Sequence, residues 1–239
     1  MNSERRNEKL DEKAIKTDNK ILLGIENYWY HYKWPTVIVL FFAIVILVCT
    51  LQMCGRESTD ITIVYAGSYA MEAEEAADIK SVLNYIMPDD YDDDGKKNSQ
   101  LLRYYIPSKE EIEKLDSKDS AVIDRTYISN ENENFFNYAN TEASVCFLSP
   151  HLYETLRDGE RLANVSELLG YTPEGLVDEY GVKLSQTDLY ADYAVLRKLP
   201  EDTVVCILRR QLTKKEAVYE NEKAFFAAIV NYNSDAENG

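Results

Sequence analysis

An uninterrupted run of 21 uncharged residues, from Trp34 to Cys54, constrains this chain more than any other feature. The rest of the chain is polar, with 28% charged residues overall and a mean hydropathy of −0.39. As a helix the run spans roughly 30 Å, the thickness of a bilayer's hydrocarbon core, and a helix satisfies its own backbone hydrogen bonds there. It therefore predicts one transmembrane helix that contacts the lipid bilayer and divides the chain into residues 1–33, 34–54 and 55–239.

Basic residues flank only one end of this run. Seven Lys or Arg precede it, whereas Arg56 is the one basic residue among the twenty that follow. An excess of Lys and Arg marks the cytoplasmic side of a transmembrane helix, and the tyrosines and tryptophans between Tyr28 and Trp34 are typical of a membrane interface. We therefore expect residues 1–33 to be a cytoplasmic tail and residues 55–239 to be an extracellular domain.

A secretory signal sequence is the alternative interpretation of the same run. Residues 51–55 (LQMCG) resemble a bacterial lipobox in which Cys54 would be lipidated, but Met53 stands where that signal has a small residue. The run is also longer than the roughly 7–15 apolar residues of a signal peptide. Either outcome leaves the same domain outside the cytoplasm.

The domain beyond the run is strongly acidic. It carries 36 Asp or Glu against 19 Lys or Arg, so the formal net charge of −16 originates there. Such a surface repels nucleic acid, and we expect no nucleic-acid partner. About 185 residues are enough for one compact domain with its own core.

Histidine and cysteine are too few for the common catalytic and metal-binding sets. His31 lies beside the apolar run, which leaves His151 as the only histidine of the domain. Cys146 and Cys206 lie in apolar runs typical of buried strands, and they are either two inert core thiols or a disulfide between neighbouring strands. No Cys or His spacing indicates zinc or a redox pair. We therefore predict that the protein is not an enzyme.

Strand-like and helix-like segments alternate through the first half of the domain. Residues 60–67 (DITIVYAG), 101–107 (LLRYYIP) and 143–150 (ASVCFLSP) are β-rich apolar runs, and segments with helical spacing of apolar residues lie between them. This alternation predicts an α/β fold with a mostly parallel sheet flanked by helices. Further on, the LPEDT turn between residues 193–198 and 204–208 predicts two neighbouring strands.

The region after the third expected strand resembles the class II periplasmic, or extracellular, solute-binding proteins of ABC transporters. In that family a strand ends in a phrase such as S-P, a helix follows, and a leucine-rich segment comes next. The matching positions here are Ser149, Pro150, Leu152, Tyr153, Leu162, Val165, Ser166, Leu168 and Leu169. The resemblance implies a membrane-tethered domain that binds a solute. The domain has room for about one lobe where that family has two, so closure of a cleft between lobes does not carry over.

Ligands of parallel sheets bind beyond the carboxyl ends of the strands. The polar and aromatic residues at these ends are Tyr65, Ser68 and Tyr69 after the first expected strand, and Ser149 and Tyr153 after the third. Tyrosine combines a flat ring with a hydroxyl, which suits a sugar, a peptide or an amine. We predict these five residues as the ligand site, with core packing as the alternative role of each tyrosine.

Residues 90–95 (DYDDDG) place Asp90, Asp92 and Asp94 at positions 1, 3 and 5 of a calcium loop, with Gly95 at the turn. The twelfth position of an EF-hand needs an acidic ligand, and Leu101 occupies it. The segment is therefore either a calcium site closed by a distant ligand or a solvated acidic connection. We expect no other cofactor.

Two functions are compatible with these features. The first is binding of an unknown solute or partner by the extracellular domain. The alternative is a non-catalytic envelope scaffold or assembly subunit that contacts other envelope proteins and binds no small molecule. The first requires a concave pocket at the strand ends, and the second requires a filled crevice or an exposed apolar patch.

Overall fold

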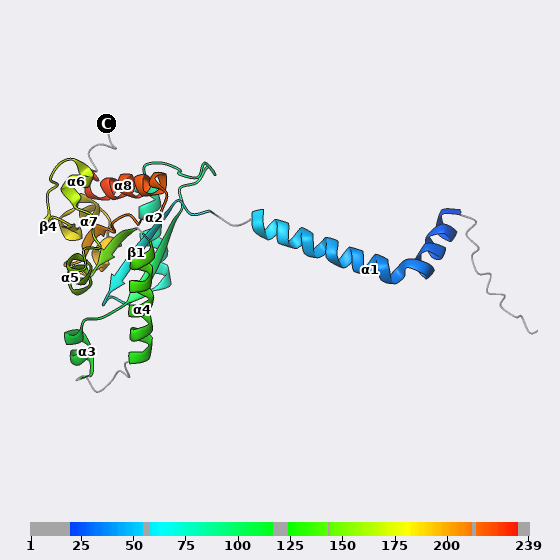
Figure 1. Ribbon diagram of the computed structural model, residues 1–239, viewed down its shortest axis with the longest axis horizontal. Helices are drawn as coiled ribbons and strands as arrows, with labels where there is room; N and C mark the ends of the chain where they lie inside the picture. Colours follow the sequence, from blue (N-terminus) through cyan, green and yellow to red (C-terminus); the bar gives the residue numbers. More distant parts are fainter. Residues whose placement is uncertain (1–19, 55–57, 117–123, 143, 212–213, 234–239) are drawn as a thin grey trace, which may run out of the picture. The chain divides into compact units, whose positions relative to one another are not determined.

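The computed structural model describes residues 20–54, 58–116, 124–142, 144–211 and 214–233. The chain forms two compact units, Met1–Arg56 and Glu57–Gly239. In the first unit, helix α1 (Lys20–Cys54) contains a segment, Tyr28–Thr50, that is long and apolar enough to cross a membrane and has no buried residue (Figure 1). One such helix near the N-terminus is a feature that membrane anchors share with signal sequences.

Helix α1 contains a proline and several polar side chains, which make contacts within the helix itself. Pro35 lies inside the helix, where proline removes one backbone hydrogen bond, and Figure 1 shows a bend in the N-terminal half of α1. The Thr50 hydroxyl donates to the carbonyl oxygen of Ile46 at 2.9 Å, so this polar group is satisfied within the helix. Tyr28 and Tyr32 stack with their ring centroids 5.2 Å apart.

The second unit is an α/β domain built on one six-stranded sheet with the order β2-β1-β3-β6-β5-β4. The strands are β1 (Ile61–Gly67), β2 (Ser99–Tyr105), β3 (Val145–Leu148), β4 (Leu176–Asp178), β5 (Gly181–Lys183) and β6 (Val204–Ile207). Strands β2, β1 and β3 are parallel, whereas the pairs β3–β6, β6–β5 and β5–β4 are antiparallel. The α/β class is confirmed, but the expectation of a mostly parallel sheet is wrong because the sheet is mixed.

The connection before β6 causes the change of direction. The segment expected to form a strand at residues 193–198 instead forms a turn and the short helix η2 (Leu196–Lys198), which follows helix α7 (Asp188–Asp192). The chain therefore enters β6 at the edge where β5 ends, and Lys183 pairs with Val204. Leu196 is 0% exposed, because this helical turn buries its side chain as well as the expected strand would.

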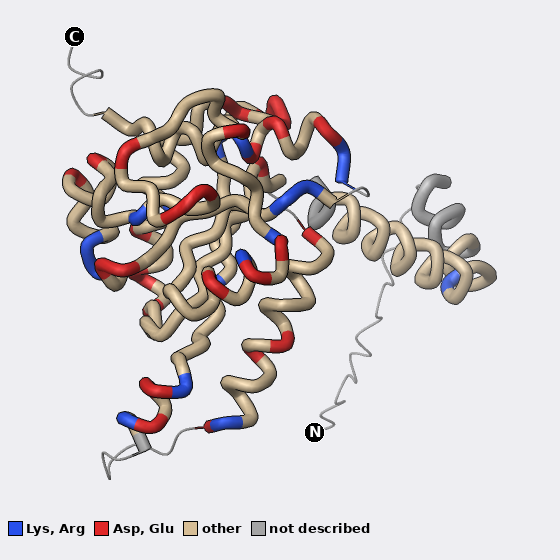
Figure 2. Tube along the Cα trace, turned by 60° about the vertical axis from the view of Figure 1, so that its left-hand side comes forward, with Lys and Arg blue, Asp and Glu red and all other residues tan. Residues whose placement is uncertain are grey.

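Helices cover both faces of the sheet. Alternate residues of β1 point to opposite faces, so Ile63 packs with α2 (Ala73–Ile86) and α8 (Glu216–Val230), whereas Val64 packs with α4 (Arg125–Thr141) and α5 (Pro150–Asp158). The remaining helices are α3 (Lys109–Asp116), α6 (Val165–Leu169) and η1 (Leu184–Gln186). Because β1 leads into α2 and β3 leads into α5, and these helices lie on opposite faces, the chain diverges beyond the ends of β1 and β3. Figure 2 shows that Asp and Glu are spread over this unit's surface.

Candidate functional site

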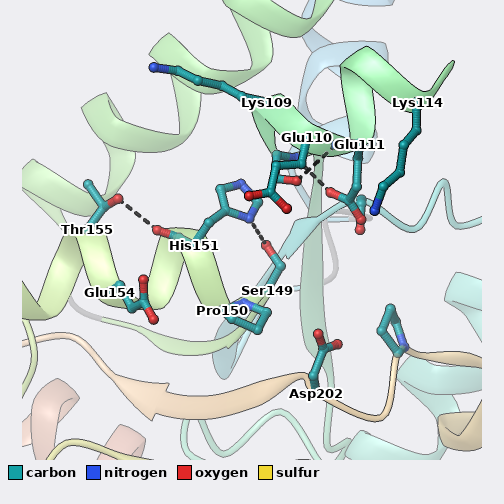
Figure 3. Close-up of a pocket in the computed structure, with 13 residues that line it drawn as sticks. Lys109, Glu110, Glu111, Lys114, Ser149, Pro150, His151, Glu154, Thr155 and Asp202 are labelled. Carbon is teal, nitrogen blue, oxygen red and sulfur yellow. Dashed lines mark hydrogen bonds between the residues drawn. The ribbon is translucent and has the colours of Figure 1, made fainter. Parts of the chain in front are cut away.

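A cavity of about 700 Å³ lies at the carboxyl ends of the three parallel strands (Figure 3). A serine follows each strand into it: Ser68 after β1, Ser108 after β2 and Ser149 after β3. The other lining residues come from α3, α5 and the segment before β6: Lys109, Glu110, Glu111, Lys114, Pro150, His151, Glu154, Thr155, Pro200 and Asp202. This is the place where the crossover connections diverge, which is the usual ligand position in open α/β sheets.

Ser149 and His151 form the wall contributed by α5. Ser149 is the N-cap of α5 and is 8% exposed, and its Oγ lies 3.0 Å from Nδ1 of His151. Burial lowers the pKa of His151, whereas the nearby Glu111 and the Ile106 carbonyl oppose that shift, so the ring is largely neutral at pH 7. Its Nε2 atom is buried and makes no hydrogen bond of good geometry within the described part of the chain.

Glu111 forms the facing wall, contributed by α3 (Figure 3). Its Oε2 accepts a bond of 2.7 Å from the Ser108 backbone N–H, and the Glu111 backbone N–H donates to Ser108 Oγ at 3.3 Å, which is a capping box at the start of α3. Burial alone would raise the pKa of Glu111, but hydrogen bonds from Ser108 and Ser68 and the electrostatic influence of His151 hold it below its ordinary value. Glu111 is therefore a fixed anion beside the cavity.

The Ser149–His151 pair differs from the arrangement in a serine hydrolase. Ser149 beside His151 has the composition of a nucleophile and its base, but the residue after Ser149 is Pro150, which has no N–H to donate to an oxyanion. The backbone of Ser149 is also relaxed, with φ −67° and ψ 153°, unlike the strained turn that presents a hydrolase nucleophile. Hydroxyls, carboxylates and a neutral imidazole instead form a set of hydrogen-bonding groups suited to a polar solute.

The structure brings two of the five predicted ligand residues, Ser68 and Ser149, together in this cavity. Tyr65 and Tyr69 line a second pocket of about 220 Å³ with Arg103, Tyr104, Tyr105 and Tyr127. There the Tyr65 hydroxyl accepts a bond of 3.1 Å from the Tyr69 backbone N–H, and the Tyr69 hydroxyl donates to Glu75 Oε2 at 2.8 Å. Both hydroxyls therefore hold the connection from β1 to α2.

Tyr153, the fifth predicted residue, lies in the core. It is 2% exposed, and its hydroxyl donates to the carboxylate of Asp178. The other Asp178 oxygen is 3.2 Å from Nη1 of Arg157. Tyr153 does not line the cavity, and its contacts correspond to the alternative role of core packing.

Eleven of the thirteen cavity residues were not among the predicted site residues, and Glu111, His151 and Asp202 are three of them. Glu111 had a signal, because Ser108 and Glu111 form an S-x-x-E capping pattern directly after Pro107. His151 had the signal of being the domain's one histidine, directly after a predicted strand. Asp202 had none, because it reaches this edge only through the antiparallel direction of β6.

The acidic loop lies at the opposite end of the sheet, before β2. Carboxylate oxygens of Asp60, Asp90 and Asp92 lie within 4.8 Å of one another, whereas Asp94 is not part of this group and accepts a bond of 2.9 Å from the Lys96 backbone N–H. Asp60 is thus the distant residue that joins the loop. Desolvation, with the charges of Asp60 and Asp94, raises the pKa of Asp92. The oxygen ligands suit calcium, and calcium binding stays a prediction.

Hydrogen bonds within the loop define its shape. Asp60 Oδ1 accepts from the backbone N–H groups of Tyr91 and Asp92 at 2.7 and 3.2 Å, and Oδ2 accepts from Asn98 N–H at 2.8 Å. Asp90 Oδ2 accepts from Gly95 N–H at 2.6 Å, and Gly95 has φ +86°, a conformation that favours glycine.

Comparisons of the chain with protein-family models, with curated proteins and with solved structures found no match. The resemblance to solute-binding proteins therefore depends on the sequence positions alone.

Proposed function

We propose that this protein is a single-pass membrane protein whose extracellular α/β domain binds a small polar solute, as a one-lobed relative of the solute-binding proteins. The observation that carries the proposal is the cavity beyond β1, β2 and β3, on which three serines, a fixed carboxylate and a neutral imidazole converge. Its volume of about 700 Å³ lies within the range of small-molecule sites, roughly 300–1,000 Å³.

The surface of the domain supports binding over the scaffold alternative. Its exposed large apolar side chains are scattered over several elements of the described chain: Tyr85, Tyr127, Tyr171, Val177 and Val218. Single exposed apolar residues are normal on soluble surfaces, whereas an assembly surface needs a contiguous patch. An assembly subunit also has no need for a hollow lined by hydrogen-bonding groups.

The membrane part of the proposal is supported by α1 and its flanks. Its apolar segment has exposed side chains along its length, and the basic residues lie on its N-terminal side. Protease added to intact cells is expected to remove the domain and to leave residues 1–33 protected. A domain that is cut only after the cells are lysed would contradict the extracellular location.

A thermal-shift screen of the full chain in lipid nanodiscs tests the binding function. The probes are sugars, amino acids, amines and short peptides, and a ligand at about 100 times its Kd stabilises a protein by about 2.7 kcal/mol. Shifts obtained with the wild type are expected to shrink in Ser149→Ala and Glu111→Gln. The matched control is Glu133→Gln, at an exposed glutamate on α4. Flat shifts for all probe classes would support the scaffold alternative instead.

A further inference from the structure

Two cysteines face each other across the junction between the parallel and antiparallel halves of the sheet. Cys146 in β3 and Cys206 in β6 are direct partners in the antiparallel register. Directly opposite residues of an antiparallel pair project to the same face, and both thiols belong to the same buried cluster. The pairing thus brings together two side chains that lie 60 positions apart in the sequence.

The strand geometry at this pair is compatible with a disulfide. The backbone N–H of Leu208 donates to the carbonyl of Ser144 at 3.0 Å, so alternation along the ladder makes Cys146 and Cys206 a hydrogen-bonded pair as well. Cα atoms of such a pair are about 5.5 Å apart, and disulfides bridge Cα separations of about 4.4–6.8 Å. The Cα separation typical of such a pair therefore lies within the range that disulfides bridge.

The folded state protects these thiols from oxidation. Both are free in the structure and 0% exposed, and Cys146 Sγ donates to the Ser144 carbonyl at 3.6 Å. Burial, with the neighbouring Cys146 thiol, raises the pKa of Cys206. Only the thiolate reacts, so an oxidant has to reach the pair before the core closes.

We propose that Cys146 and Cys206 become joined by a cross-strand disulfide while the domain folds outside the cytoplasm. The oxidant is a low-molecular-weight or protein disulfide. One cysteine thiolate attacks one sulfur of the oxidant, so that the oxidant's S–S bond breaks, a mixed disulfide forms and the other sulfur is released as a thiol. The second cysteine thiolate then attacks the mixed disulfide, the Cys146–Cys206 bond forms and the remaining oxidant sulfur leaves as the second thiol. Two electrons pass to the oxidant, and the two protons lost by the cysteines end on its thiols. The location depends on the proposed function, because disulfides persist in oxidising compartments.

The bond would connect two strands that lead to lining residues of the cavity. β3 leads directly to Ser149 and His151, and Asp202 lies two residues before the start of β6, so both strands position lining residues at the same edge. A covalent link between these strands fixes their register and limits the separation of these lining residues. The reduced and oxidised chains are therefore expected to differ in thermal stability, with the oxidised chain melting several degrees higher.

Refolding of the full chain tests the bond independently of its location. In a Cys49→Ser, Cys54→Ser background, the denatured chain is refolded with oxidised and reduced glutathione, denatured again and alkylated without reductant. The expected product is lighter than the dithiol by two hydrogens and carries no alkyl group. If the chain is reduced before alkylation, it should carry two alkyl groups. The Cys206→Ser chain serves as control and carries one group, on Cys146. Two alkyl groups on the refolded, unreduced chain overturn the proposal.

Alkylation of the chain extracted directly from cells tests whether the bond forms during synthesis. We expect that Cys146 and Cys206 are not alkylated and that external protease removes the domain. Two labelled thiols on a protease-accessible domain overturn the proposal while leaving the extracellular location intact. A domain that protease does not reach contradicts the proposed location, and in that case the refolding result alone decides whether the pair bonds.

Discussion

The two ends of the parallel strands are both rich in polar side chains, but they use them differently. At the amino end, one carboxylate, that of Asp60, accepts three backbone N–H groups and holds the acidic loop in place. At the carboxyl end, side chains from several separate elements converge on a hollow, and the buried His151 Nε2 makes no hydrogen bond of good geometry within the described chain. The denser sequence motif thus forms a loop held by its own hydrogen bonds, although Asp90 Oδ1 and the Tyr91 hydroxyl are buried without a partner in the described chain. The cavity instead draws its residues from several separate elements.

Asp60→Ala gives the largest expected effect, because it removes the acceptor of three backbone N–H groups at the amino end. We expect a loss of about 2–4 kcal/mol in the free energy of unfolding, measured by urea denaturation of the domain within the full chain. Asp94→Ala is the comparison in the same loop, because the Asp94 carboxylate accepts one backbone N–H in the described chain, that of Lys96. This variant should lose about 1 kcal/mol or less of the free energy of unfolding. Equal losses for the two variants would contradict the organising role of Asp60.

Calcium tests whether the amino end is also a binding site. An ion among Asp60, Asp90 and Asp92 would relieve the repulsion of three carboxylates, so millimolar calcium is expected to stabilise the wild type by about 1 kcal/mol. Asp90→Asn should abolish that gain, and magnesium should not reproduce it. No heat in a calorimetric titration at millimolar calcium would leave the loop with a structural role only.

Glu111→Gln is expected to change stability less than Asp60→Ala does, and to change binding more. Glutamine keeps the shape and the hydrogen-bond acceptor of the capping box, so the loss of unfolding free energy should stay below about 1 kcal/mol. Any ligand that interacts with the anion should bind more weakly, whereas Glu133→Gln leaves affinity unchanged. A large loss of stability with unchanged affinity would make Glu111 a structural residue like Asp60.

The smallest expected effect is the pH dependence contributed by His151. Its folded pKa is lowered, so the unfolded chain binds the proton more readily, and this contribution to stability is lost as pH falls through the unfolded value of about 6.5. His151→Gln should flatten that part of the stability profile. Glu111→Gln should lower the His151 pKa further in NMR titrations, with His31→Gln used to assign the second histidine. A rise in the His151 pKa in that variant would contradict the contact.

Much of the fold could be predicted because local signals agree with the tertiary structure. The expected strands at residues 60–67, 101–107 and 143–150 correspond to β1, β2 and β3. The continuous apolar pattern of β1 and β3 reflects burial on both faces, whereas β2 is a half-buried edge strand. No such local pattern in the sequence indicates whether a strand runs parallel or antiparallel to its neighbour. The antiparallel course of β6 depends on how the chain folds between residues 184 and 203, where Leu196 is buried in a helical turn instead of a strand.

The sequence predicts the sheet edge at which the site lies better than it predicts which residues line the site. Ser68 and Ser149 line the cavity because any residue directly beyond a parallel strand reaches that edge. Tyr153, four positions after Ser149, is turned by α5 into the core, where its ring lies against Gly181. The helix phase of α5 and the presence of Asp202 at the same edge both depend on tertiary contacts, which one sequence does not specify.

The most direct test of solute binding is the imidazole NMR spectrum of His151 in the full chain, recorded while a compound that raises the melting temperature is titrated in. Because His151 lines the cavity, we predict that its resonances shift and reach saturation at the same concentration as the thermal stabilisation. The Glu133→Gln control should behave as the wild type does. A stabilising compound that leaves the His151 resonances unchanged at saturation would contradict the assignment of the cavity as the binding site.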